Sequence, residues 1–317
     1  MTTAILHIHK TPLAHIDLND HTYSIIPFEL EDHSATIAAH VQKTGILRPP
    51  VLQERIADSF RVVGGQARLA AARVLGISSV ACHILPKETP ELKTFMIALT
   101  DAISERQISA IEKAVFFRKI TKICSVEEAA ISYLPVLGLP QRSSIINKLL
   151  TLLTLEQPVA EAVHNGVLDE KAAYVLSGLS FRDRLVLFEI ISALRLSVSN
   201  QRKLIESCTD LSLRENSSIP TILSSKPVQD ILNHKEANPP QKAANLMSFL
   251  QAALSPKYTE AQKAFNALKQ SLKLPGWATL THASAFEKDE LNLSLTFKNA
   301  ETLTEFCHNS FKKTKEK

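Results

Sequence analysis

Short apolar runs alternate with short helical patterns in the first third of the chain. Runs of β-prone residues predict strands at 5–9, 23–26, 50–53, 60–63 and 81–85. Apolar positions three and four apart predict helices over 34–43 and 67–75, and each is followed by a glycine of the kind that ends helices. This mixture predicts a small α/β domain over residues 1–98.

The pattern from residue 99 to residue 206 is almost wholly helical. Ser125 and Glu128 have the spacing of a capping box, in which each side chain satisfies a backbone amide at the helix start. A further helix is predicted to begin at Pro140, because proline suits a first helical turn. We therefore predict an all-α domain over residues 99–206.

The last third of the chain opens with a polar, proline-rich segment, residues 207–240, which predicts a linker. Residues 241–317 then predict two helices, a hairpin and a final helix. Strict alternation over 291–297 predicts a strand with one buried face, and the final helix is expected to bury Leu303, Phe306 and Phe311. Such an α/β module suits self-association. The predicted fold class is α+β, mostly helical.

Composition excludes several functional classes. The chain has only 8 glycines in 317 residues, without the G-x-G-x-x-G or G-x-x-x-x-G-K-[ST] loops of dinucleotide and P-loop enzymes. Its 4 cysteines are scattered, which favours reduced thiols over a disulfide framework or a zinc site. No apolar run approaches the roughly 18 residues of a membrane span, so we expect a cytoplasmic protein. A net charge of +4 is compatible with a polyanionic partner.

Several sequence boxes follow one another in a recognisable order. Residues 45–52 read GILRPPVL, and a strand then leads into GGQARLAAA at 64–72. The helical region continues with IEKA at 111–114 and VHNGVL at 163–168. Over about residues 15–206, this order resembles the ParB family of bacterial chromosome and plasmid partition proteins. The fold that the resemblance implies is a ParB/sulfiredoxin-like domain, a helix-turn-helix domain and a C-terminal dimerisation module.

The resemblance implies that the N-terminal domain binds CTP and Mg²⁺ and closes a dimeric clamp on DNA, with at most slow CTP hydrolysis. Glycine at position 65 would let backbone amides approach a phosphate, and Arg68 would present a forked guanidinium to it. Asp101 is the implied metal ligand. The implied nucleotide-binding residues are Gly45, Arg48, Pro49, Gly65, Gln66, Arg68 and Asp101.

The chain departs from the family boxes where phosphates would bind. The family's G-E-R-R-x-R reads GQARLA here and keeps one arginine of three, and Glu105 stands in place of another arginine. Fewer cations weaken a triphosphate site. The alternative is therefore a diverged adaptor that keeps the fold but has lost nucleotide binding. A sulfiredoxin-like enzyme is disfavoured because Gln66 occupies the position of its reactive cysteine.

The predicted DNA reader is the second helix of a helix-turn-helix, with Gly138 in the turn and Pro135 ending the first helix early. The candidate DNA-binding residues are Gln141, Arg142, Ser143, Ser144, Asn147 and Lys148. We expect a nucleoid-associated homodimer that acts in partition or gene regulation. The partners that the resemblance implies are DNA and a ParA-type ATPase, and we expect no association with a membrane.

Overall fold

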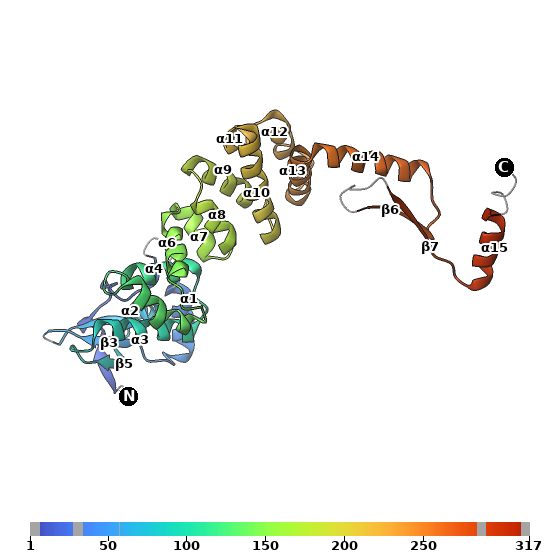
Figure 1. Cartoon of the computed structure of the whole chain (residues 1–317). Coiled ribbons are helices and arrows are strands. Elements are labelled where there is room, and N and C mark those ends of the chain that lie inside the picture. Colours follow the sequence, from blue (N-terminus) through green and yellow to red (C-terminus); the bar gives the residue numbers. More distant parts are fainter. Residues whose placement is uncertain (1–6, 28–33, 57, 284–289, 312–317) are drawn as a thin grey trace. The chain divides into compact units, whose positions relative to one another are not determined.

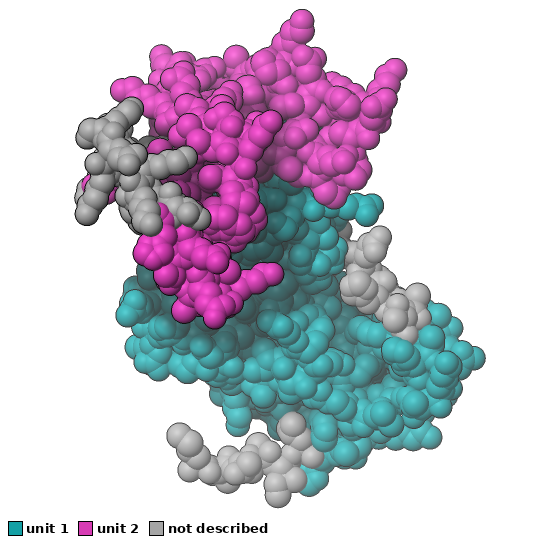
Figure 2. All heavy atoms as spheres, turned by 90° about the vertical axis from the view of Figure 1, so that its right-hand side faces the viewer, with its two compact units in different colours: residues 1–205 teal, residues 206–317 magenta. Residues whose placement is uncertain are grey.

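The computed structural model describes residues 7–27, 34–56, 58–283 and 290–311 (Figure 1). The chain forms two compact units, residues 1–205 and residues 206–317, which Figure 2 colours separately. The division falls inside helix α10 (Val198–Glu215). Helices dominate both units, and the predicted α+β fold class is confirmed.

The N-terminal part of the first unit is built on a five-stranded mixed sheet of order β1-β5-β3-β4-β2. Strands β1 and β5 pair antiparallel, as do β3 and β4, whereas β3–β5 and β2–β4 are parallel. The strands are β1 (Ile8–Pro12), β2 (Ile16–Asp17), β3 (Val51–Glu54), β4 (Phe60–Gly64) and β5 (Ser79–Leu85), with a 3₁₀ turn η1 (Leu13–His15) before β2. Four of the predicted strands thus have counterparts in this sheet, although residues 1–6 lie outside the described part.

Helices α1 (Ser34–Thr44) and α2 (Gln66–Val74) agree with the predicted helical patterns. The apolar face of α2 supplies Leu69 and Ala72 to a core shared with Leu52 of β3. Its other face packs on α1. Helix α3 (Glu91–Glu105) follows the sheet. This packing fixes the start of α2 directly after the C-terminal end of β4.

The predicted strand at 23–26 is wrong. This segment is a loop, although Tyr23 and Ile25 are buried as their apolar character suggested. Its backbone does not pair with the sheet, because the carbonyl of Ser24 and those of neighbouring residues accept hydrogen bonds from Lys119. An apolar run alone cannot distinguish a strand from a buried loop.

The helical part of the first unit shares a core with the N-terminal part. Ring contacts of 4.8 to 6.1 Å run from Tyr23 through Phe95 and Phe116 to Tyr133. The helices of this part are α4 (Ala110–Ile120), α5 (Val126–Tyr133), α6 (Ser143–Thr151), α7 (Gln157–His164), α8 (Glu170–Ser177), α9 (Phe181–Ala193) and α10, with 3₁₀ turns η2 (Pro135–Leu137) and η3 (Leu152–Thr154). The capping box predicted at Ser125 and Glu128 is present.

The helix expected to begin at Pro140 begins instead at Ser143. Gly138 adopts φ +68° after η2, and Arg142, the residue before α6, has an extended backbone. The predicted early end of the first helix is confirmed, since α5 stops at Tyr133 and Pro135 opens the η2 turn. The connection between α5 and α6, residues 134–142, is therefore longer than the common three- or four-residue turn of a helix-turn-helix.

Residues 207–240 are mostly helical, not the linker that their prolines suggested. They hold the end of α10, then α11 (Ile219–Leu223), α12 (Lys226–Leu232) and the start of α13 (Pro239–Leu254). The three later helices carry their prolines within the first two positions. Proline is tolerated there because those amides have no partner inside the helix, so these prolines begin helices and do not break them.

The C-terminal elements are α14 (Pro256–Ser271), the antiparallel pair β6 (Ala278–His282) and β7 (Leu291–Leu295), and α15 (Ala300–Phe311). The predicted hairpin and final helix exist, but their predicted burial is wrong. Leu291, Leu293 and Leu303 are 49%, 54% and 44% exposed, and Phe306 is half-buried. The side chain of Phe311 and residues 284–289, between the two strands of the hairpin, lie outside the described part. A single chain leaves this apolar surface uncovered.

Candidate ligand cavity and nucleic-acid interface

Two glycines at the junction of β4 and α2 let side chains approach the backbone closely. Gly65 adopts φ +85°, and a Cβ there would lie 3.0 Å from both Pro50 Cβ and Arg68 Cζ. A Cβ on Gly64 would lie 2.5 Å from the carboxylate of Asp101. Both positions therefore require glycine, for its left-handed backbone at 65 and for space at 64 and 65.

A cavity of about 560 Å³ opens beside this junction. The predicted nucleotide-binding residues that line it are Gly65, Gln66, Arg68 and Asp101. The predicted residues that do not line it are Gly45, Arg48 and Pro49. Arg48 still contacts its rim, because its guanidinium donates to Ser104 at 2.8 Å and to Asp101 at 3.3 Å. Sequence reasoning thus identified four residues of one real cavity.

The side chain of Arg68 is only 8% exposed, and its two Nη groups donate hydrogen bonds whereas its buried Nε donates none. Nη1 donates to the backbone carbonyl of Arg48 at 2.7 Å, and Nη2 donates to Asp101 at 2.8 Å. Nε lies 3.4 Å from the carboxylate of Glu105. The single arginine that the sequence offered for phosphates is therefore already paired with two carboxylates.

The implied CTP and Mg²⁺ can be tested against this geometry. The glycine junction suits a phosphate, and the first amides of α2 have no side-chain cap. The charges do not suit one, because Arg68 is neutralised and the other arginine that lines the cavity, Arg106, is ion-paired with Glu112. Gln66 is also engaged, since its amide donates to the carbonyl of Leu18 at 2.6 Å. In the state described, the donor set does not fit a triphosphate.

Glu112 is a buried carboxylate at the start of α4, with no exposed side-chain surface. Arg106 donates two hydrogen bonds to it, and the amide of Ser109 donates a third at 2.8 Å. Burial alone would raise the pKa of Glu112, but these hydrogen bonds outweigh it and hold the pKa below the usual value. His164 of α7 lies 3.8 Å away. This network joins the cavity rim to the helical part.

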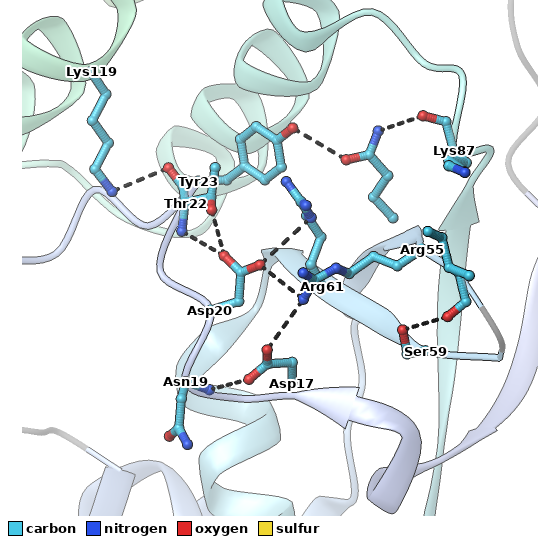
Figure 3. A network of polar contacts seen from close by, with 12 residues as sticks. Asp17, Asn19, Asp20, Thr22, Tyr23, Arg55, Ser59, Arg61, Lys87 and Lys119 are labelled. Atoms are coloured by element: carbon cyan, nitrogen blue, oxygen red, sulfur yellow. Dashed lines mark hydrogen bonds and ion pairs between the residues drawn. The ribbon is translucent and has the colours of Figure 1, made fainter.

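A second polar network, which sequence reasoning missed, lies around the loop before Tyr23 (Figure 3). Asp20 faces Arg55 and Arg61 at 3.5 and 3.6 Å. The hydroxyl of Tyr23 donates to the buried amide oxygen of Gln53 at 3.2 Å. Only the fold brings residues from this loop and from β3 and β4 together, so nothing in the local sequence signals this network.

Lys119 of α4 fastens the same loop to the helical part (Figure 3). Its ammonium group donates to the carbonyls of His21, Thr22 and Ser24 at 2.6, 3.2 and 2.6 Å. Burial, with a smaller contribution from Arg118, lowers the pKa of Lys119 to about 8. The loop that it holds continues into Ile25, which lines the cavity. One side chain of the helical part thus positions a wall of the cavity.

Helix α6 presents the predicted DNA-binding residues on one face. Its apolar face buries Ile146 and Leu149 against the domain core. The polar positions that are exposed are Gln141, Arg142, Ser144, Asn147 and Lys148, and Ser143 is half-buried. Arg142 makes no side-chain hydrogen bond or ion pair with any described residue. The amides at the start of α6 also have no side-chain cap.

Lys148 is held in a defined position on this face. Its ammonium group lies 4.3 Å from the centre of the Tyr174 ring of α8, a cation–π contact that leaves the lysine exposed. The structure therefore brings all six predicted residues together at one end of α6 and along its outer face. This end of α6 combines an uncapped helix start with two exposed cations, Arg142 and Lys148, and such a surface suits a polyanion.

Fold and site together define a helix-turn-helix protein with a mixed α/β domain at its N-terminus. The sequence model of the ParB HTH domain matches residues 106–210, which covers α4 to α9 and most of α10. Residues 106–210 are therefore a ParB-type helix-turn-helix domain, and the resemblance predicted from the sequence boxes is confirmed.

Curated relatives support the same family. The chain is 29% identical over 154 residues to the nucleoid occlusion protein of Halalkalibacterium halodurans, covering 49% of this chain and 50% of that one. It is 27% identical over 171 residues to the nucleoid occlusion protein of Bacillus cytotoxicus, covering 53% and 56%. The chain spans about half the length of the curated relatives it matches.

Solved structures with a partial likeness include the C-terminally truncated chromosome-partitioning protein ParB from Caulobacter crescentus. Its complex with the centromeric parS site is 18% identical, with a TM-score of 0.38, covering 62% of this chain and 98% of that chain. Its complex with CTP-gamma-S is also 18% identical, with a TM-score of 0.28, covering 59% and 99%. Both TM-scores are too low to align the folds residue by residue.

No helix in the described ranges combines the length and the apolar character needed to cross a membrane.

Proposed function

We propose that this protein binds duplex DNA through α6 and acts in chromosome or plasmid partition, nucleoid occlusion or gene regulation. The observation that carries the proposal is the exposed polar face of α6, which presents Asn147 and Lys148, together with the exposed Arg142 directly before the helix. Arginine and lysine neutralise phosphates, and asparagine can pair with a base edge in the major groove. The ParB HTH match over the same residues supports this assignment.

The direct test adds one negative charge to this face. Asn147→Asp should weaken binding of a mixed-sequence duplex at low salt by about tenfold, because the new carboxylate faces phosphates. Fluorescence anisotropy measures the affinity. The matched control is Gln270→Glu, which adds the same charge at an exposed position of α14. No binding by the wild type, or equal weakening by both variants, would contradict the proposal.

We propose further that the protein is a homodimer that associates through β6, β7 and α15. A two-stranded sheet is marginal alone, and this one leaves Leu291 and Leu293 exposed, while Trp277 just before β6 is 44% exposed. A second copy would cover this apolar surface. Light scattering should give a dimer for the wild type and a monomer for Leu291→Ser/Leu293→Ser. A wild-type monomer at micromolar concentration would contradict the assignment.

The cavity beside Gly65 is the candidate site for the CTP and Mg²⁺ that the family resemblance implies. The glycine junction and the uncapped start of α2 support a phosphate-bearing ligand there, while the paired arginines oppose tight binding. Calorimetric titration with CTP and MgCl₂ tests the site. Absence of binding at millimolar nucleotide would remove the nucleotide-switch function and leave DNA binding untouched.

A ParA-type ATPase is the partner that the resemblance implies for a partition role. Stimulation of such an ATPase by this protein in the presence of DNA would support partition. Absence of stimulation would favour nucleoid occlusion or gene regulation.

A further inference from the structure

The anion-binding end of the cavity is filled by the protein's own carboxylates. Asp101 and Glu105 lie one helical turn apart on α3, so both side chains face Arg68 across the cavity. Their oxygens lie 2.8 and 3.4 Å from the guanidinium, where the oxygens of a bound phosphate would otherwise be expected. The remaining Arg68 donor is taken by the carbonyl of Arg48.

The charges in and around the cavity are balanced. Arg48, Arg68 and Arg106 are each within 3.4 Å of at least one carboxylate. The three carboxylates in these pairs belong to Asp101, Glu105 and Glu112. An arriving phosphate would therefore meet no unpaired arginine among the described lining residues, and it would be repelled by two carboxylates.

We infer that Glu105 is a specificity-determining residue that masks Arg68 and sets the affinity of the cavity for phosphate-bearing ligands. The inference rests on the proposed nucleotide site. The inference goes beyond that proposal in two ways. It names Glu105 as the residue that limits binding, and it states that Glu105 disfavours ligands with several negative charges.

Glu105 limits binding more than Asp101 does, because the two pairs differ in strength. Asp101 is 11% exposed, receives hydrogen bonds from both Arg48 and Arg68, and contacts Gly64 closely, so it is part of the cavity wall. Glu105 is 41% exposed at the C-terminal end of α3, and its contact with Arg68 is longer. A carboxylate at a helix C-terminus is also disfavoured by the helix dipole. Glu105 can therefore be replaced without disturbing the wall.

The test compares Glu105→Gln with the wild type by calorimetry, using three probes: CTP with MgCl₂, inorganic tripolyphosphate, and cytidine. The variant removes one negative charge near the phosphate position and leaves Arg68 Nε, which makes no hydrogen bond, without its ion pair. We expect tripolyphosphate and CTP to bind about tenfold more tightly to the variant. Cytidine has no phosphate, so its binding should not change. Glu88→Gln, at an exposed position of the loop before α3, is the matched control and should match the wild type.

The outcomes separate the masking from the site itself. Equal affinity of the wild type and Glu105→Gln for tripolyphosphate and CTP would overturn the masking and leave the nucleotide site intact. No binding of either probe to the wild type, Glu105→Gln or Glu105→Arg would overturn both the masking and the proposed nucleotide site. A thermal melt of each variant confirms that it is folded before the titration.

Discussion

The cavity and the outer face of α6 contain the same kinds of residues but use them differently. In the cavity, Arg68 is buried and paired with carboxylates on α3. On α6, Arg142 is exposed and forms no ion pair with any described residue, and Lys148 is exposed above an aromatic ring. A cation of the first kind stabilises the fold, and a cation of the second kind is available to a partner.

This difference shows why a sequence box does not by itself identify a binding site. The boxes placed Arg68 and Asp101 in one nucleotide site, and the fold does bring them together, 2.8 Å apart. They contact each other, however, so Asp101 neutralises the positive charge of Arg68 that a phosphate ligand would need. Whether a charged side chain can bind a ligand depends on the residues around it in the fold. The spacing of residues within one sequence box does not identify those neighbours.

The largest expected effect on stability is at Glu112, whose network joins the cavity rim to the helical part. Glu112→Ala should lower the free energy of unfolding by about 3 kcal/mol, because a fully buried carboxylate is lost from a network with Arg106 and Ser109. Urea unfolding at neutral pH measures this loss. The control is Glu128→Ala, which removes the exposed capping-box acid of α5 and should cost about 1 kcal/mol or less. Equal losses would mean that the junction is no stronger than a surface cap.

The glycine junction should tolerate less change than an open turn. Gly65→Ala combines a positive φ with a Cβ at 3.0 Å from Arg68 and Pro50, so we expect a loss of about 2 kcal/mol and weaker binding of any cavity ligand. Gly45→Ala is the matched control, since Gly45 has φ +71° but no atom within 4 Å of its Cβ position. It should cost only the backbone strain, about 1 kcal/mol. Thermal melts compare the two variants, and a larger loss at Gly45 would contradict the crowding at Gly65.

Lys119 should couple the two regions more weakly. Lys119→Met removes three hydrogen bonds to the loop before the cavity, and we expect faster amide exchange in that loop and a loss of about 1 kcal/mol at pH 7. Lys122→Met, at an exposed position after α4, should change neither quantity. Hydrogen exchange that is unchanged in the loop would show that Lys119 does not hold it.

Lys119 is also expected to cause a pH dependence of stability. The pKa of Lys119 is lowered to about 8 in the folded state from 10.5, so the folded protein binds fewer protons than the unfolded chain between these values. This lysine therefore makes stability rise with pH from about 8 to 10.5. The stability difference between wild type and Lys119→Met should grow in favour of the wild type over that range. Urea unfolding at pH 7.5 and pH 9.5 measures it, and a constant difference would contradict the lowered pKa.

Local signals predicted the elements that local chemistry controls. The capping box at Ser125, the helix pattern of α2 and the effect of Pro135 were all readable from a few neighbouring residues. The prolines of residues 207–240 misled, because proline both ends and begins helices and only the following residues decide which. The alternation of β7 predicted a buried face, but Leu291 and Leu293 on that face are exposed in this chain.

The candidate sites were predictable to the extent that they are continuous in sequence. Four of the six candidate DNA-binding residues lie within α6, so their shared face followed from the helical period, and Gln141 and Arg142 directly precede it. The pairing of Arg68 with Glu105 joins residues on different helices, and the network of Asp20 joins a loop to Arg61 of β4 and to Arg55 just after β3. Such contacts depend on tertiary packing, which no short spacing encodes.

The most direct test of the account is the salt dependence of DNA binding. If Arg142 and Lys148 contact phosphates, Arg142→Ala/Lys148→Ala should reduce the slope of log affinity against log salt by about 2, because each phosphate contact contributes about 0.9. The control Lys257→Ala/Lys263→Ala removes the same charge from exposed positions of α14 and should leave the slope nearly unchanged. A wild-type slope retained by the α6 variant would contradict the claim that α6 is the DNA-binding face.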